Sequence, residues 1–517
     1  MTRTIVIGAG VGGLATAALL AREGHEVTVF ERLDRVGGRA GSMSADGFRF
    51  DTGPSWYLMP RVFEHFFNLL DTTAHEQLDL RLVDPGYAVF SQPDAGASEG
   101  EKVTVPSGRE GVRRLFEGRE AGAGARIDAY LDSANRAADL AEREFLYNPF
   151  TRPSSMVSGG VLRAAPRLAR LLGTSLDSMI SRSFADPLLR QILGFPAVFL
   201  GTSPMDAPAM YHLMSAYDLD DGVRYPMGGF WEIVQRLRAL AEREGARIVT
   251  GADVTAITTD GTGKARRATG VVVNGETVPA DVVVSAADLH HTETALLEPA
   301  ARSYPEEWWE KKVSGPGAVL VMLGVRGELP QLPHHSMFFA QDWEANFDAI
   351  FGDAPRVPSP ASTYVCRPSA TDPAVAPPGH EALFVLVPVP ADARMSAEAV
   401  LATADAAIDQ VASWAGVPHL RERIVTRHAV GPQDFAQQYH SWHGGMLGPA
   451  HVLKQSAMFR PGNASKKVRG LFYAGATTSP GIGVPMCLIS AELVLKRIRG
   501  DHSAGPLPVR APVRATA

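Results

Sequence analysis

Cysteine is scarce in this chain of 517 residues, which contains only Cys366 and Cys487. The two residues are far apart in the sequence and do not form the C-x-x-C spacing that is typical of redox pairs and metal sites. This sparse usage suits a reducing, cytoplasmic compartment rather than a small secreted fold held together by disulfides.

An excess of positive charge is absent as well. The chain has 50 basic and 56 acidic residues, which gives a formal net charge of −6 at pH 7. A surface with this balance has no general attraction for phosphate backbones, so we expect no nucleic-acid partner.

The sequence also lacks a long, uninterrupted hydrophobic run. Residues 5–21 and 471–491 are uncharged, but glycines interrupt the first stretch, and two prolines and several glycines interrupt the second. Such residues break an apolar helix. We therefore expect neither a signal peptide nor a transmembrane helix.

What the chain does contain is enough apolar material for a large core. Hydrophobic residues make up 45% of the sequence and charged residues 21%, as in ordinary globular proteins. Because the chain exceeds the size at which a single core stops growing, we expect two closely packed domains with room for a deep cleft between them.

The N-terminus has the pattern of a βαβ unit. Residues 4–7 read as a short strand, 8–13 as a turn, 14–23 as a helix and 26–30 as a second strand that ends at Glu31. The turn carries the pattern Gly-x-Gly-x-x-Gly. Its position between a strand and a helix predicts a dinucleotide-binding unit.

The glycines of this turn have separate roles in such a unit. Gly8 permits the tight turn, Gly10 allows the backbone to approach a pyrophosphate, and Gly13 allows close packing of helix and strand. Gly12 lies in the same turn. The helix N-terminus then faces the phosphates, and the Glu31 carboxylate is expected to bind ribose hydroxyls.

A second glycine pair follows at Gly37 and Gly38, with Arg39 directly after it. Paired glycines permit a backbone approach that a Cβ atom would obstruct, and a guanidinium can neutralise a diphosphate through two hydrogen bonds. We expect all three residues to bind the cofactor. For Arg39, a surface ion pair is the alternative.

The segment 470–491 reads as a strand, a Gly/Pro turn and an apolar helix. Backbone amides at the start of such a helix suit an anion or a carbonyl group of a cofactor. We therefore expect Gly475, Gly483 and Val484 to lie at the cofactor site.

These segments together resemble a known family. Residues 36–39 are similar to the GG-doublet fingerprint of FAD enzymes in the amine oxidase and carotenoid desaturase superfamily. Residues 470–491 resemble the signature of bacterial-type phytoene desaturases, although Thr477 and Ser479 depart from its usual residues. The resemblance continues at residues 225–229, 285–290, 364–368, 371–373 and 455–461.

The resemblance implies an FAD-dependent oxidoreductase of CH–CH groups, which desaturates phytoene or a similar polyene in carotenoid biosynthesis. A long apolar tunnel is expected, because a hydrocarbon is bound through burial of apolar surface alone. Val254, on an expected strand at 252–258, falls where the family's backbone usually meets the adenine of FAD. A plain sheet residue is the alternative.

The expected fold is α/β: a Rossmann-type FAD-binding domain of the GG-doublet class with an interleaved α+β substrate-binding domain. The FAD-binding domain is discontinuous because the βαβ pattern returns later in the chain. The expected bounds are 1–75, 225–295 and 455–500 for the FAD-binding domain, 76–224 and 296–454 for the substrate-binding domain, and 501–517 for a disordered tail.

No catalytic side chain can be named from the sequence. The candidate proton acceptors are His290, His291, His440 and His443. Structural or surface histidines explain each of them as well. We expect no metal, because neither His334–His335 nor the pair His440 and His443 has cysteine or carboxylate ligands at zinc-type spacing.

Residues 145–175 have arginine as their only charged residue type, set among leucines and valines. This combination suits docking on anionic headgroups, although an ordinary amphipathic helix explains it too. We expect a cytoplasmic enzyme bound peripherally to the inner face of the cell membrane, where a polyene substrate dissolves. The oligomeric state is left open.

Other functions on the same scaffold also stay open at this point. They are a carotenoid isomerase or ketolase, an amine oxidase, and a non-catalytic prenyl-lipid carrier of the GDP-dissociation-inhibitor type. The carrier is the least favoured, because Glu31, Arg39 and the C-terminal turn are retained.

Overall fold

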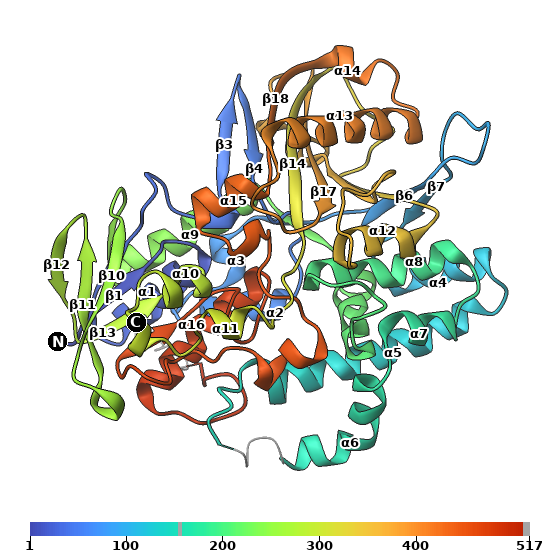
Figure 1. Ribbon diagram of the computed structural model, residues 1–517. Coiled ribbons are helices and arrows are strands. Elements are labelled where there is room, and N and C mark those ends of the chain that lie inside the picture. The colour runs from blue at the N-terminus through green and yellow to red at the C-terminus, as the bar shows by residue number, and fades with distance from the viewer. Residues whose placement is uncertain (153–157, 510–517) are drawn as a thin grey trace, which may run out of the picture.

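A five-stranded parallel sheet positions the N-terminal turn. The computed structural model describes residues 1–152 and 158–509 (Figure 1). The strands of this sheet, in spatial order, are β19 (Leu471–Tyr473), β13 (Val282–Ser285), β1 (Arg3–Ile7), β2 (Glu26–Phe30) and β9 (Arg247–Val249). All neighbouring strands run parallel. The carboxyl ends of β1, β13 and β19 therefore meet at one edge of the sheet.

Both faces of this sheet are covered. Three helices share a core with Val6 on one face: α1 (Val11–Arg22), α9 (Phe230–Arg243) and α16 (Val484–Arg499). An antiparallel sheet packs with Ile5 and Ile7 on the other face: β10 (Val254–Asp260), β11 (Arg267–Val273) and β12 (Glu276–Pro279). Burial on two sides explains why Ile5, Val6 and Ile7 of β1 are all apolar and do not alternate with polar residues.

The strands of this sheet come from three distant parts of the chain. β19 pairs with β13, with Leu471 opposite Val283, and β13 pairs with β1. The closing strand therefore lies in the same sheet as the first βαβ unit. This pairing supports the discontinuous FAD-binding domain, whose bounds remain a prediction.

A seven-stranded mixed sheet forms the second large layer (Figure 1). Its strands, in spatial order, are β18 (Ile424–Val430), β14 (Gly317–Arg326), β17 (His380–Val389), β16 (Thr363–Cys366), β15 (His335–Phe339), β6 (Tyr87–Ser91) and β7 (Lys102–Val105). Side chains alternate along β14 and β17. Val321 and Val385 pack under helix α13 (Ala397–Trp414), whereas Leu320 and Phe384 face the other way.

Helices make up a third part of the molecule, between β7 and the return to the parallel sheet. They are α4 (Arg109–Arg119), α5 (Ala123–Ala141), α6 (Gly159–Leu172), α7 (Leu176–Ser181) and α8 (Pro187–Gly194). Figure 1 shows α6 at the lower edge of the molecule, away from both large sheets. Among the described residues, no helix combines the length and apolar character needed to cross a membrane.

Shorter elements connect these layers. The strands are β3 (Ser42–Ala45), β4 (Phe48–Asp51), β5 (Leu80–Leu82) and β8 (Arg224–Pro226). The helices are α2 (Pro60–Asn68), α3 (Ala74–Gln77), α10 (Leu289–Thr294), α11 (Glu306–Trp309), α12 (Trp343–Phe351), α14 (Leu420–Arg423) and α15 (Pro432–Tyr439).

The structure differs from the expected disordered tail over residues 501–509. Leu507 is buried and its amide donates to Glu492 Oε1. The Lys496 ammonium donates to the carbonyl oxygens of Ser503 and Gly505. A buried ammonium and a buried carboxylate on α16 thus hold this segment, whose composition alone indicated disorder. Residues 510–517 of the expected tail lie outside the described residues.

Candidate functional site

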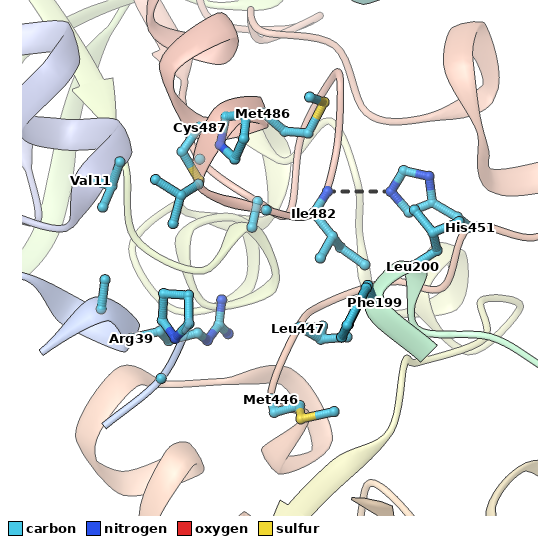
Figure 2. Close-up of a pocket in the computed structure, with 18 of the residues that line it drawn as sticks. Val11, Arg39, Phe199, Leu200, Met446, Leu447, His451, Ile482, Met486 and Cys487 are labelled. Atoms are coloured by element: carbon cyan, nitrogen blue, oxygen red, sulfur yellow. Dashed lines mark hydrogen bonds between the residues drawn. The ribbon is translucent and has the colours of Figure 1, made fainter. Parts of the chain in front are cut away.

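One cavity of about 670 Å³ links the glycine-rich turn to the seven-stranded sheet. Its wall begins at Gly8 and the start of α1 and continues to Leu320, Phe384 and Leu386 on the sheet. Figure 2 shows Val11 and Arg39 around the same opening as Met446, Ile482 and Cys487. Segments that are hundreds of residues apart in sequence therefore share one cavity.

The structure brings nearly all of the predicted cofactor residues to this cavity. Those that line it are Gly8, Gly10, Gly12, Glu31, Gly37, Gly38, Arg39, Val254, Gly475, Gly483 and Val484. Gly13 lies outside the lining, and a Cβ atom there would collide with the carbonyl oxygen of Gly8. Its position fits the packing role that the motif assigns to the third glycine.

The Glu31 carboxylate is held at the end of β2. Its Oε2 accepts from the amide of Ala9 at 2.7 Å, and its Oε1 accepts from the amide of Leu33 at 2.9 Å. A carboxylate has further acceptor sites on both oxygens, and Glu31 lies on the cavity wall. The side chain is thus fixed in place and can still accept from hydroxyl groups.

Arg39 is held by partners within the chain and also faces the cavity. Its Nη2 donates to Ser441 Oγ and lies 3.4 Å from Asp288 Oδ2. Its Nε is buried and has no partner among the described residues. An unpaired donor on a cavity wall is the position at which a bound anion would complete the hydrogen bonding.

The C-terminal turn between β19 and α16 forms the opposite wall. The amide of Gly475 donates to Ser490 Oγ at 2.8 Å, and Gly483 has a φ of +115° directly before the helix. Behind this turn, buried Arg460 donates to the carbonyl oxygens of Ala476 and Thr478. Burial lowers the Arg460 pKa to about 10, so its side chain stays charged at pH 7.

His451 supports the same turn and was not found by sequence reasoning. Its Nε2 accepts from the amide of Ile482 at 3.3 Å (Figure 2). The proton of the neutral ring therefore lies on Nδ1, which donates to the Tyr211 hydroxyl at 2.9 Å, and Tyr211 donates to Ser456 Oγ. Burial holds the His451 pKa well below its ordinary value. His451 therefore positions the turn as a neutral ring.

We expect Gly481→Ala to loosen this turn. Gly481 has a φ of +143°, and a Cβ atom there would collide with the His451 ring. The strain should cost about 1–3 kcal/mol and should lower both the melting temperature and the FAD content. Gly462→Ala is the matched control, because a Cβ atom at Gly462 has open space around it. Equal FAD content in the two purified variants would contradict this role.

Of the four candidate proton acceptors, two line the cavity and two do not. His291 and His440 line the cavity as a stacked pair with ring centroids 3.8 Å apart. Burial lowers the pKa of both rings, to about 4 for His291, and the neighbouring Arg32 charge lowers both further. His290 contacts Glu306 at 3.0 Å, and His443 packs on Trp442. Neither residue lines the cavity.

The remainder of the cavity wall is mostly apolar and comes from several parts of the molecule. The main contributors are Phe195, Phe199, Met210 and Met214 of the helical part, Leu320, Met337, Phe384 and Leu386 of the mixed sheet, and Phe347 of α12. Leu168 and Leu172 extend the lining to α6. These residues come from elements that are far apart in the sequence, and no local pattern marks them as a group.

Comparison with known proteins decides the family. A family model described as "Flavin containing amine oxidoreductase" matches residues 11–498. The chain belongs to this family. The expected GG-doublet flavoprotein fold, the oxidoreductase class and FAD as the cofactor are thereby confirmed.

Curated members of the family are similar over nearly the full chain. The carotenoid 3,4-desaturase of Haloarcula japonica is 39% identical over 490 residues, which cover 94% of this chain and 96% of the relative. The zeta-carotene-forming phytoene desaturase of Myxococcus xanthus is 36% identical over 503 residues, which cover 96% of this chain and 93% of the relative.

Solved structures share the fold at lower identity. An oxidoreductase from Methanosarcina mazei aligns with a TM-score of 0.62 and 18% identity, covering 96% of this chain and all of that one. A putrescine oxidase bound to putrescine aligns with a TM-score of 0.59 and 16% identity, covering 96% of this chain and 99% of that one. These matches establish the family fold, whereas the choice of substrate rests on sequence similarity and on the cavity.

Proposed function

We propose that this protein is an FAD-dependent carotenoid desaturase, which removes hydrogen from a CH–CH unit of phytoene or a similar polyene. The observation that carries the proposal is the cavity, which joins the cofactor cradle to a long apolar wall. Relatives named as carotenoid and phytoene desaturases, at 39% and 36% identity over nearly the full chain, support the same assignment.

The residues around the glycine-rich turn would hold the nucleotide part of FAD. The N-terminus of α1, reached through Gly10 and Gly12, suits the pyrophosphate, because unpaired amides and the helix dipole favour an anion there. Arg39 has the free Nε for the same group, and Glu31 has acceptors for ribose hydroxyls. We assign Val254 to the adenine side.

The C-terminal turn would hold the flavin part. Gly475, Gly483 and Val484 line the cavity, and hydrogen bonds from Arg460 and to His451 hold the backbone of this turn. When bound, FAD supplies the hydride acceptor. The chain itself excludes water, orients the polyene by apolar contacts and keeps its buried rings neutral, and we assign no side chain the role of catalytic base.

Product analysis tests this function directly. Expression in a host that accumulates phytoene and no later carotenoid should yield products with longer conjugated systems, which absorb at longer wavelength. A second host that supplies more unsaturated carotenoids covers the chemistry named for the Haloarcula japonica relative. Isomerised or oxygenated products, or oxidation of an amine such as putrescine by the purified enzyme, would favour the alternatives.

We further propose that the enzyme docks on the inner face of the cell membrane through α6. Leu162 and Leu172 are 60% and 40% exposed on this helix, and Leu172 also lines the cavity. Arg163 and Arg170 are exposed beside them. An exposed apolar helix face with flanking arginines suits a surface of anionic lipid, and it would place the cavity entrance where a polyene dissolves.

Not every arginine of α6 is available for docking. Arg167 is half-buried and donates to Ser133 Oγ at 2.9 Å, so it anchors α6 to α5 instead of facing lipid. The expected docking stretch was 145–175, of which residues 153–157 lie outside the described residues. The docking surface proposed for α6 is therefore Leu162, Arg163, Arg170 and Leu172.

Replacing Arg163 and Arg170 by glutamine should weaken binding to anionic liposomes by about 2 kcal/mol, or about thirtyfold, before screening by salt. Flotation assays at two salt concentrations measure the effect, and FAD content should stay at the parental level. Arg167→Gln is the matched control, since it should alter stability rather than flotation. If the double variant floats as the parental protein does, the docking surface, and with it the cavity entrance, lies elsewhere.

A further inference from the structure

A group of polar side chains lies behind the cavity wall formed by Trp56 and Tyr364. It consists of His334, His335 and Cys366, all buried and none of them in the cavity lining. Antiparallel pairing of β15 with β16 places His335 directly opposite Cys366, so the two side chains share one face of the sheet. The pairing supplies the cysteine that sequence spacing did not reveal.

The three potential ligand atoms converge. The two imidazole nitrogens and the thiol sulfur all lie within 4.8 Å of one another. Tetrahedral zinc has bonds of about 2.0–2.3 Å, which place ligand atoms about 3.5 Å apart. Closing the cluster around one ion would therefore need shifts of about 1 Å in the ligand atoms.

The hydrogen bonds of both histidines leave the same ring atom free. His334 Nδ1 contacts Thr371 Oγ1 at 2.6 Å, and His335 Nδ1 contacts the Tyr364 hydroxyl at 2.7 Å. Both Nε2 atoms are buried and have no partner among the described residues. Metal-bound histidines show this pattern, in which one ring nitrogen donates to an oriented oxygen and the other bears the ligand lone pair.

A further unpaired group lies beside the cluster. The Tyr225 hydroxyl is buried without a partner among the described residues, and its ring packs on His334 at a centroid distance of 4.7 Å. Unpaired buried polar atoms are rare in folded proteins, and a concentration of them calls for a bound species that satisfies them. Imidazole nitrogens are the commonest metal ligands in proteins, so a cation fits this group.

We propose that His334, His335 and Cys366 bind one zinc ion outside the cavity. Two imidazole nitrogens and a thiolate are a ligand set that zinc takes in proteins, with a water molecule or the Tyr225 hydroxyl as the fourth ligand. On binding, the Cys366 thiol loses its proton to solvent and its sulfur forms the bond to zinc. No electron is transferred.

The ion would act on the cavity from outside it. His335 packs on Trp56 at a centroid distance of 4.8 Å, and its Nδ1 contact orients Tyr364, which in turn contacts Ser55 Oγ at 2.7 Å. Trp56, Tyr364 and Ser55 all line the cavity. Fixing the His335 ring therefore fixes this part of the substrate wall.

Metal titration of the FAD-containing full chain, prepared without a polyhistidine tag, tests the site. After removal of metal by a chelator, we expect uptake of one Co²⁺ per chain, with d–d bands of tetrahedral cobalt beyond the flavin absorbance and a thiolate charge-transfer band. Zn²⁺ should displace the cobalt and raise the melting temperature. Absence of these bands in the parental protein would overturn the proposal, whatever the variants do.

Variants identify the ligands. Cys366→Ser and His335→Gln should each weaken Zn²⁺ binding by at least about 100-fold, since loss of a ligand exceeds the effect of changing its hydrogen-bond partner. Cys487→Ser and His419→Gln are the matched controls, because Cys487 lies at the cavity and His419 is exposed on the surface. Equal zinc affinity of Cys366→Ser and Cys487→Ser would also overturn the site.

Discussion

A Gly10→Asp variant is expected to purify as a folded but colourless apoprotein. A Cβ atom at Gly10 meets only the carbonyl oxygen of Gly37, at 4.0 Å, and otherwise points into open space at the cavity. The apoprotein therefore has room for the side chain, whereas a bound pyrophosphate would lie against a carboxylate. Repulsion between charges about 4 Å apart costs about 4 kcal/mol at an effective dielectric constant near 20, which corresponds to about a thousandfold loss of FAD affinity.

FAD titration of the apoprotein, together with circular dichroism, measures this effect. Gly10→Ala should lose much less affinity, because it adds a methyl group without a charge. Gly13→Val should instead fail to fold, because a Cβ atom at this position collides with the carbonyl oxygen of Gly8. Stoichiometric FAD in purified Gly10→Asp would contradict the placement of the pyrophosphate at the N-terminus of α1.

The parts of the fold that follow from local pattern were predicted well. Strand 26–30 was expected and is β2, and the helix expected after the glycine turn is α1, which begins three residues earlier, at Val11. Glycines, apolar runs and charged ends determine these elements over a few residues. Gly8, Gly10 and Gly12 of the first turn line the cavity, and their contacts with the cofactor stay a prediction.

The cavity wall could not be predicted in the same way. His451 meets Ile482 at the wall, and His335 meets Cys366 behind it, only because strands and turns from distant segments pair. Sequence spacing shows none of these contacts. The prediction for residues 501–509 was wrong for a related reason. Their composition indicated disorder, but the buried Lys496 ammonium on α16 donates to carbonyl oxygens of this segment.

The alternating pattern of the mixed sheet leads to the second large expected effect. Leu386 lies on β17 between Val385 and Val387, which pack under α13, and faces the cavity opposite Leu320. Leu386→Asp should retain FAD but lose polyene desaturation by at least about 100-fold. An apolar substrate would strip water from the new carboxylate, and an unpaired polar group buried in this way costs about 1–3 kcal/mol, with a charge costing more.

Two further substitutions at Leu386 separate charge from shape. Leu386→Met keeps the side-chain volume, so its free energy of unfolding should stay within about 1.5 kcal/mol of the parental value. Leu386→Asn has the size of the aspartate variant without its charge, so it should fall between the two. Burial against substrate raises the pKa of a carboxyl group above its unperturbed value. Lowering the pH should therefore neutralise the aspartate and recover activity towards that of Leu386→Asn, whereas the asparagine variant should show no such recovery. Equal turnover of Leu386→Asp and the parental enzyme, with FAD content unchanged in both, would show that the polyene passes elsewhere.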